Sequence, residues 1–246
     1  MKNLKSHWDT IYSNPKGFEF PWIQEIPSTS LLLVDIIKLP KNAKTIDIGG
    51  GDSFFVDHLI NLGFTNISVL DISENAINKA KKRLGENAKL VQWFITDIKD
   101  FQPNTTFDLW HDRATFHFLK SKEDIEAYYQ LANESISHDG HIILSSFSDN
   151  GPNTCSELGV TQYNKTKLTS IFERGFNRIK CIIEDHITPS NSIQNFIFCL
   201  FKHRPNNLEP NHNQDEDEYI LKINSVNGSD VNLSCDINNK GKCCNN

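Results

Sequence analysis

The chain has 246 residues, a net charge of −6 and an ordinary apolar content of 38%. This length suits one large domain or two small ones, and the composition is that of a globular protein. No apolar run approaches the roughly 20 residues of a membrane helix, and residues 1–12 lack signal-peptide and transit-peptide character. The negative charge argues against a nucleic-acid partner. We therefore expect a cytoplasmic protein without membrane or nucleic-acid contacts.

In chain order, the first part of the sequence predicts a helix over 30–39, a strand over 44–50, a helix over 53–63, a strand over 67–73, a helix over 74–85 and strands over 89–98 and 107–114. The second part predicts a helix over 122–136, a turn at 138–140, a strand over 141–148, a helix over 165–175 and strands over 178–187 and 193–203. The short polar turn at 189–192 makes the last two strands antiparallel. The expected fold is α/β: a Rossmann-like, seven-stranded, mostly parallel sheet with helices on both faces and a terminal antiparallel hairpin.

The composition changes near His203, which divides the chain into a domain at 1–203 and a tail at 204–246. The tail holds eleven asparagines and the acidic run 215–218. Such a segment buries too little apolar surface to offset its chain entropy, so we expect it to be disordered. Residues 219–226, "YILKINSV", form the one stretch of the tail that could pair as an edge strand.

The six cysteines include no Cys-x-x-Cys pair and no Cys/His cluster at metal-ligand spacing, so no metal site is expected. Cys181 and Cys199 fall in apolar, strand-like runs and are expected to be buried thiols. This cysteine pattern indicates a reduced, cytoplasmic protein.

The glycines Gly49, Gly50 and Gly51 lie between a strand and a helix, where α/β folds bind cofactors. A dinucleotide fingerprint needs a small residue where Phe54 stands, and the Lys-Ser/Thr of a phosphate loop is absent. Asp47, two residues before the first glycine, repels phosphate and suits a cation. These features argue against an NAD-dependent oxidoreductase.

Acidic residues end three successive predicted strands: Asp47, Asp71 and Asp97. They suit an ammonium group, two ribose hydroxyls and an adenine amine, respectively, while the helix start after Gly51 offers backbone N–H groups to a carboxylate. S-adenosylmethionine carries all four groups and no phosphate. The alternative is that these acids are a turn residue, a helix N-cap and a surface charge.

The segments "IDIGGGDS", "VLDIS", "FITDI" and "FDLWHDRATFHFL" resemble, in that order, the motifs of class I S-adenosylmethionine-dependent methyltransferases. The resemblance extends from Leu4 to about His203. It implies methyl transfer by in-line displacement, a seven-stranded sheet and the cofactor contacts Asp47, Gly49, Gly50, Gly51, Asp71, Ile72, Asp97 and Ile98.

A narrower resemblance concerns "LWHDRATFHFL", which is similar to the Asp-Lys-Gly-Thr element of methyltransferase-like protein-lysine methyltransferases and to the Trp-Asp-Arg-Gly element of thiopurine methyltransferases. Ala114 replaces the glycine. "HWDTIY" and "FPWIQEIP" resemble the opening segment of the lysine-methylating group. The resemblance implies a protein lysine as acceptor, with Asp112 and His111 receiving or orienting its amine.

Around this site, Trp8 and Tyr12 are four residues apart, on one helix face that can close over the methionine end of the cofactor. Trp22 and Arg113 are expected to contact the acceptor. The alternatives are a packing role for the tryptophans and a structural ion pair between Asp112 and Arg113. A methyltransferase acting on a small thiol or amine and a non-catalytic cofactor-binding protein also stay open, and we expect a monomer.

Overall fold

The computed structural model describes residues 4–14, 20–204, 221–225 and 233–235. Its strands are β1 (Lys44–Ile48), β2 (Asn66–Asp71), β3 (Val91–Ile95), β4 (Phe107–Arg113), β5 (Ile136–Phe147), β6 (Thr154–Cys155), β7 (Leu158–Gly159), β8 (Phe176–Ile187), β9 (Ile193–His203), β10 (Leu221–Ser225) and β11 (Leu233–Cys235). Its helices are α1 (Leu4–Ser13), α2 (Ser28–Ile37), α3 (Phe55–Asn61), α4 (Glu74–Leu84), α5 (Lys122–Ser135) and α6 (Lys165–Phe172), with short 3₁₀ turns at Gly85–Leu90, Ile98–Asp100 and Phe116–Phe118.

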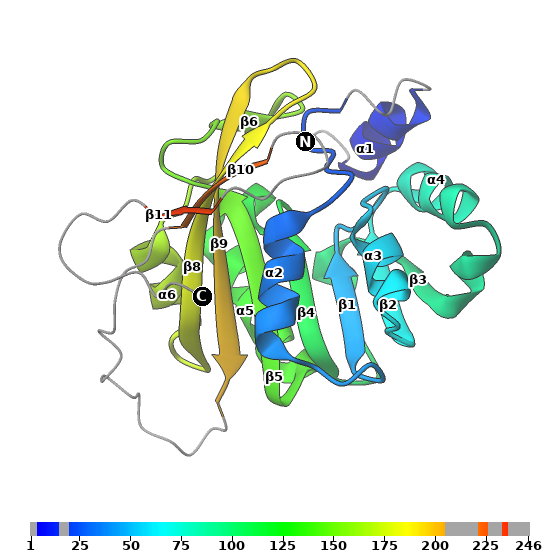
Figure 1. The fold of residues 1–246 in the computed structure, drawn as a ribbon, viewed down its shortest axis with the longest axis horizontal. Helices are drawn as coiled ribbons and strands as arrows, with labels where there is room; N and C mark the ends of the chain where they lie inside the picture. The colour runs from blue at the N-terminus through cyan, green and yellow to red at the C-terminus, as the bar shows by residue number, and fades with distance from the viewer. Residues whose placement is uncertain (1–3, 15–19, 205–220, 226–232, 236–246) are drawn as a thin grey trace.

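The main sheet has the strand order β11-β10-β8-β9-β5-β4-β1-β2-β3 (Figure 1). Strand β1 pairs in parallel with β2 and β4, and β4 pairs in parallel with β5. Strand β9 is antiparallel to both β5 and β8, so its arrow in Figure 1 points opposite to that of β1. All of the predicted strands are present, and the predicted Rossmann-like, mostly parallel sheet with a terminal antiparallel hairpin is confirmed.

Helices cover both faces of the sheet because its central strands are apolar on both sides. One buried cluster joins the sheet to α2, α3 and α4 through side chains such as Leu33, Phe55 and Ile77. The other joins it to α5 and α6 through side chains such as Tyr128 and Phe172. Helices α2 to α6 therefore pack on the two faces of the sheet.

Helix α4 begins at a cap that also holds α1. The Ser73 hydroxyl accepts a hydrogen bond from the Ala76 N–H at 3.2 Å and donates one to Asp9 of α1 at 2.8 Å. The Asn75 side chain donates to the Asp9 carbonyl at 2.9 Å. These bonds dock α1 beside α4, at the end of the sheet toward which β1 points (Figure 1).

Strand pairing changes one predicted element and bears on the tail. The turn expected at 138–140 lies inside β5, where Asp139 has a φ of 66° and the β4–β5 register shifts. Within the tail, β10 pairs in parallel with the β8 edge and β11 pairs with β10, so part of "YILKINSV" is a strand. The remaining tail residues, for which disorder is expected, lie outside the described residues.

The expectation that Cys181 and Cys199 are buried thiols is wrong, because the two residues form a disulfide. They are direct cross-strand neighbours of β8 and β9, with Cα atoms 4.2 Å apart. Residues opposed in this way project their side chains to the same face, within bonding reach. Cys155 is a free cysteine.

Candidate cofactor and acceptor site

A cavity of about 360 Å³ opens at the carboxyl ends of the parallel strands. It brings together most of the residues predicted from sequence: Gly49, Asp71, Ile72, Asp97, Ile98, Trp8, Tyr12, Trp22 and Arg113. A smaller cavity of about 50 Å³ shares Tyr12, Trp22, Gly49 and Arg113 with the first and is lined by Asp47, Gly50 and His111 as well. Gly51 and Asp112 line neither of these two cavities.

The glycine turn packs directly on two of the predicted acids. Gly49 and Gly51 have φ angles of 65° and 42°, in the left-handed region that favours glycine. A Cβ atom on Gly50 would lie 2.5 Å from Asp47 Oδ2, and one on Gly51 would lie 2.7 Å from Asp71 Oδ2. Only a backbone without side chains comes this close to both carboxylates.

Asp71, the last residue of β2, lies at the acidic end of the larger cavity. Its Oδ1 accepts a hydrogen bond from the Ser73 N–H at 2.7 Å. Burial, assisted by the nearby charge of Asp47, raises the pKa of Asp71 to about 7. A pair of hydroxyl donors in the cavity would stabilise the ionised form of this carboxyl group.

Asp97 both caps a short turn and lines the larger cavity, and the capping role was not considered for it from the sequence. Its side chain caps the 3₁₀ turn Ile98–Asp100 by accepting from the Lys99 N–H at 3.0 Å. The same residue lines the cavity together with Ile98. The cap fixes the orientation of the carboxylate, and the neighbouring Lys99 side chain is paired with Asp124 at 3.1 Å.

Asp47 is joined to two buried polar side chains. Its Oδ1 lies 2.6 Å from His111 Nδ1, and His111 Nε2 lies 2.8 Å from the Ser30 hydroxyl of α2. The His111 ring stacks on Phe55 with centroids 4.0 Å apart. Asp47 Oδ2 is buried and has no hydrogen-bond partner. Both ring nitrogens of His111, a predicted catalytic residue, are therefore engaged within the protein.

Asp112, the other predicted catalytic residue, is fully buried. It accepts hydrogen bonds from the Tyr128 hydroxyl at 2.6 Å and from the backbone N–H groups of Thr115 and Phe116 at 2.9 and 3.2 Å. Burial raises its pKa to about 6. These bonds stabilise the turn after β4. Because the Asp112 carboxyl group is engaged in them, its surroundings do not support the predicted role of binding the acceptor.

Arg113 lies at the junction of the two cavities as a half-buried residue whose Nε and Nη2 atoms are buried. Its Nη1 donates to the Trp22 carbonyl at 2.8 Å, and its guanidinium lies 4.9 Å from the centre of the Phe196 ring. Nε and Nη2 are buried without a hydrogen-bond partner. Burial lowers the pKa of Arg113, an effect opposed by the charge of Glu184. No described ion pair joins Arg113 to Asp112, so the structural pair considered from the sequence is not formed.

Aromatic rings form the roof of the cavity. Trp8 and Tyr12 lie on one face of α1, as predicted, with ring centroids 6.3 Å apart. Trp8 contacts Trp22 and Phe118 edge to face at 6.0 and 5.4 Å. Trp22 also stacks on Phe20 at 4.7 Å. This cluster shields its side of the cavity from water.

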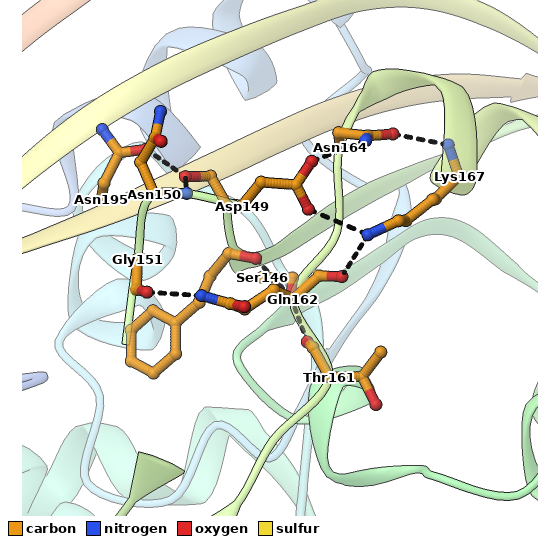
Figure 2. A network of polar contacts seen from close by, with 11 residues as sticks. Ser146, Asp149, Asn150, Gly151, Thr161, Gln162, Asn164, Lys167 and Asn195 are labelled. Atoms are coloured by element: carbon orange, nitrogen blue, oxygen red, sulfur yellow. Dashed lines mark hydrogen bonds and ion pairs between the residues drawn. The ribbon is translucent and has the colours of Figure 1, made fainter. Parts of the chain in front are cut away.

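The loop between β5 and α6, which carries Cys155 to the cavity wall, is fixed by polar contacts (Figure 2). Asp149 accepts hydrogen bonds from Asn164 at 2.6 Å and from Lys167 at 2.9 Å. The Gln162 side chain donates to the Gly151 carbonyl across the loop. The wall on this side is therefore built from the chain beyond β5.

Sequence reasoning missed Ser30 and Tyr128, the partners of His111 and Asp112. Ser30 is the last polar residue before the apolar run 31–34, a position that signals burial without naming a partner. Among the described residues, no cluster of three His, Cys, Asp or Glu side chains is suited to a metal ion, and no helix is long and apolar enough to cross a bilayer.

Comparison with known proteins connects this geometry to a family. Residues 46–142 match a family model described as a methyltransferase domain. A curated relative, malonyl-[acyl-carrier protein] O-methyltransferase 2 of Ilyobacter polytropus, is 31% identical over 114 residues, which cover 46% of this chain and 41% of the relative. The chain thus spans about two fifths of the length of this relative.

Solved structures agree with the fold. One, from work on conversion of a disulfide bond into a thioacetal group during echinomycin biosynthesis, has a TM-score of 0.68, is 17% identical and covers 83% of this chain and 94% of its own. The N-methyltransferase NodS of Bradyrhizobium japonicum, in complex with S-adenosylhomocysteine, has a TM-score of 0.61, is 16% identical and covers 83% of this chain and 100% of its own. Residues 46–142 therefore resemble a methyltransferase domain, and the chain has the fold of class I S-adenosylmethionine-dependent methyltransferases.

Proposed function

We propose that the chain transfers a methyl group from S-adenosylmethionine to a carboxylate oxygen of a small or carrier-bound acid. The observation that carries the proposal is Arg113, a buried guanidinium with two unpaired nitrogen atoms at the junction of both cavities. A buried cation without a partner is costly unless a ligand supplies the anion.

The residues present fit the cofactor. Asp47 Oδ2 is a buried oxygen without a partner and suits the ammonium group, while Asp71 and Asp97 suit the ribose hydroxyls and the adenine amine. The glycine turn leaves no room for a Cβ atom beside Asp47 or Asp71. When bound, S-adenosylmethionine supplies an electrophilic methyl group on a sulfonium. The chain's own residues orient the acceptor and exclude water.

A carboxylate acceptor suits the rest of the site because it is already deprotonated near neutral pH. Asp112 and His111 are both engaged in buried hydrogen bonds, and a carboxylate needs no base from either. The guanidinium of Arg113 can hold one carboxylate oxygen while the other faces the methyl donor. The curated relatives' printed activity, methylation of a malonyl group on an acyl-carrier protein, is of this type.

A protein lysine stays the prediction from sequence. That acceptor has a pKa of about 10.4 and must lose a proton before transfer. The two residues predicted to assist are buried and bonded elsewhere, and the two unpaired guanidinium nitrogen atoms of Arg113 suit an anion. These observations favour an acid over an amine.

The test is to incubate the purified chain with radiolabelled S-adenosylmethionine and, separately, short dicarboxylic acids, their carrier-bound thioesters and a cell lysate. We expect label in methyl esters, which release methanol in mild alkali. Methylated lysine keeps its label under the same treatment. Alkali-stable label in the protein fraction, with none in the acids, would establish the lysine prediction instead.

Cofactor affinity is expected to depend on pH through Asp71. Its pKa of about 7 means that the carboxyl group is protonated below this pH and ionised above it. Only the ionised form accepts hydrogen bonds from both ribose hydroxyls. S-adenosylhomocysteine should therefore bind roughly tenfold more tightly at pH 8 than at pH 6.

Calorimetry across this range checks the expectation, with Asp71→Asn as the matched control. The variant should bind more weakly and without the pH dependence. An equal pH dependence in the variant would assign the effect to another group.

A further inference from the structure

We propose that His111, held by Ser30, is a positioning residue that fixes Asp47 so that its free oxygen receives the ammonium group of the cofactor. The inference rests on the proposed function, since it concerns the amino-acid end of the same ligand. In this proposal His111 orients a cofactor-binding carboxylate, whereas the sequence predicted that it would receive or orient the acceptor amine.

The three side chains form one buried row from α2 through β4 to β1. Ser30, His111 and Asp47 have exposed fractions of 1%, 2% and 3%. The two links measure 2.8 Å and 2.6 Å, both good hydrogen-bond lengths. The stacked ring of Phe55 restricts rotation of the imidazole.

Donor and acceptor chemistry fixes the direction of the row. An ionised carboxylate only accepts hydrogen bonds, so His111 Nδ1 carries the hydrogen that reaches Asp47 Oδ1. In the neutral imidazole, Nε2 then accepts from the Ser30 hydroxyl. Asp47 thereby selects the tautomer, and the Ser30 hydroxyl, which can donate or accept, holds the other side of the ring by donating to Nε2.

This order of groups is also that of a serine hydrolase triad. Ser30, however, is 1% exposed on α2 and lines neither of the two cavities, so no carbonyl group can approach its oxygen. Ser30 therefore supports the His111 ring and does not act as a nucleophile. Asp47 is the member of the row that can reach a ligand.

Asp47 Oδ2 faces the turn where the ligand would lie. A Cβ atom on Gly50 would come within 2.5 Å of this oxygen, and Asp47 and Gly50 both line the smaller cavity. The other acid of that cavity, Asp52, is paired with Arg83. Asp47 Oδ2 is thus the carboxylate oxygen left for a cation in this part of the described structure.

The experiment compares two ligands by calorimetry. S-adenosylhomocysteine carries the amino-acid end, whereas 5′-methylthioadenosine has the same adenosine and thioether without it. His111→Phe keeps an aromatic ring against Phe55 but removes both hydrogen bonds. We expect it to weaken S-adenosylhomocysteine about tenfold and to change 5′-methylthioadenosine less than about twofold.

His111→Asn is the matched rescue, because its amide nitrogen can replace Nδ1 as donor to Asp47. It should keep both affinities within about threefold of the wild type. If His111→Phe does not fold, Ser30→Ala serves instead, with an expected loss of about threefold for S-adenosylhomocysteine alone.

Equal loss of both ligands, or no loss of S-adenosylhomocysteine, would overturn the positioning role. Failure of the wild-type chain to bind either ligand would instead refute the proposed cofactor. The two failures are therefore distinguishable in one set of titrations.

Discussion

Replacement of Arg113 by methionine is expected to lower kcat/KM for an acidic acceptor by roughly 10²–10³-fold, because a buried anion would lose its charged partner. Methionine keeps an unbranched apolar side chain but lacks the guanidinium that lies over the Phe196 ring. Affinity for S-adenosylhomocysteine should stay within about threefold. Steady-state kinetics and calorimetry on one preparation measure both quantities.

The same variant should melt at the wild-type temperature or above it. The Nε and Nη2 atoms of Arg113 are buried without hydrogen-bond partners, so the fold holds this charge at a cost. Arg174→Met is the control, since Arg174 is half exposed and paired with Glu126. A large loss of S-adenosylhomocysteine affinity would assign Arg113 to the carboxylate of the cofactor and contradict its role toward the acceptor.

Gly49→Ala is expected to destabilise the fold by roughly 2–5 kcal/mol, from left-handed strain and overpacking together. The new Cβ atom would lie 1.8 Å from Thr115 Oγ1, at a φ of 65°. Thr115 cannot move away freely because its hydroxyl donates to the Ile48 carbonyl at 3.1 Å. Cofactor binding should fall with stability, because the turn lines both cavities.

Gly63→Ala separates the two contributions. Gly63 has a φ of 86°, but its Cβ atom would meet nothing within 4 Å, so it should cost only about 1–2 kcal/mol. Adding Thr115→Ala to Gly49→Ala should recover the difference. Denaturant unfolding measures each variant, and equal losses for Gly49→Ala and Gly63→Ala would show that the contact with Thr115 is unimportant.

The fold was predictable because its signals are local. Strand and helix periodicities, together with the glycine turn, located all of the central strands and the acids at their ends. The sequence also indicates that Asp112 and Arg113, as neighbours on one strand, lie on opposite faces of the sheet. Successive side chains point to opposite faces, so Asp112 reaches Tyr128 of α5 while Arg113 reaches the Trp22 carbonyl on the other side.

The partners of the site residues were not predictable, because they come from distant parts of the chain. Ser30 is 81 residues from His111, and Trp22 is 91 residues from Arg113. No periodicity links such positions, and only the packed helices and strands bring them together. The disulfide escaped prediction for the same reason, since it depends on the exact register of β8 and β9.

The cavity walls come from two different parts of the chain. Gly49, Asp71, Asp97, Arg113 and Phe118 lie inside the matched range 46–142, whereas Trp8, Tyr12, Trp22 and Cys155 lie before and after it. The matched range therefore supplies the acids and only part of the wall around them. Changes confined to residues 20–27 and 147–196 can alter acceptor choice and leave the acids and the docking of α1 in place, which makes these two segments the natural targets for a mutant library that seeks new substrates.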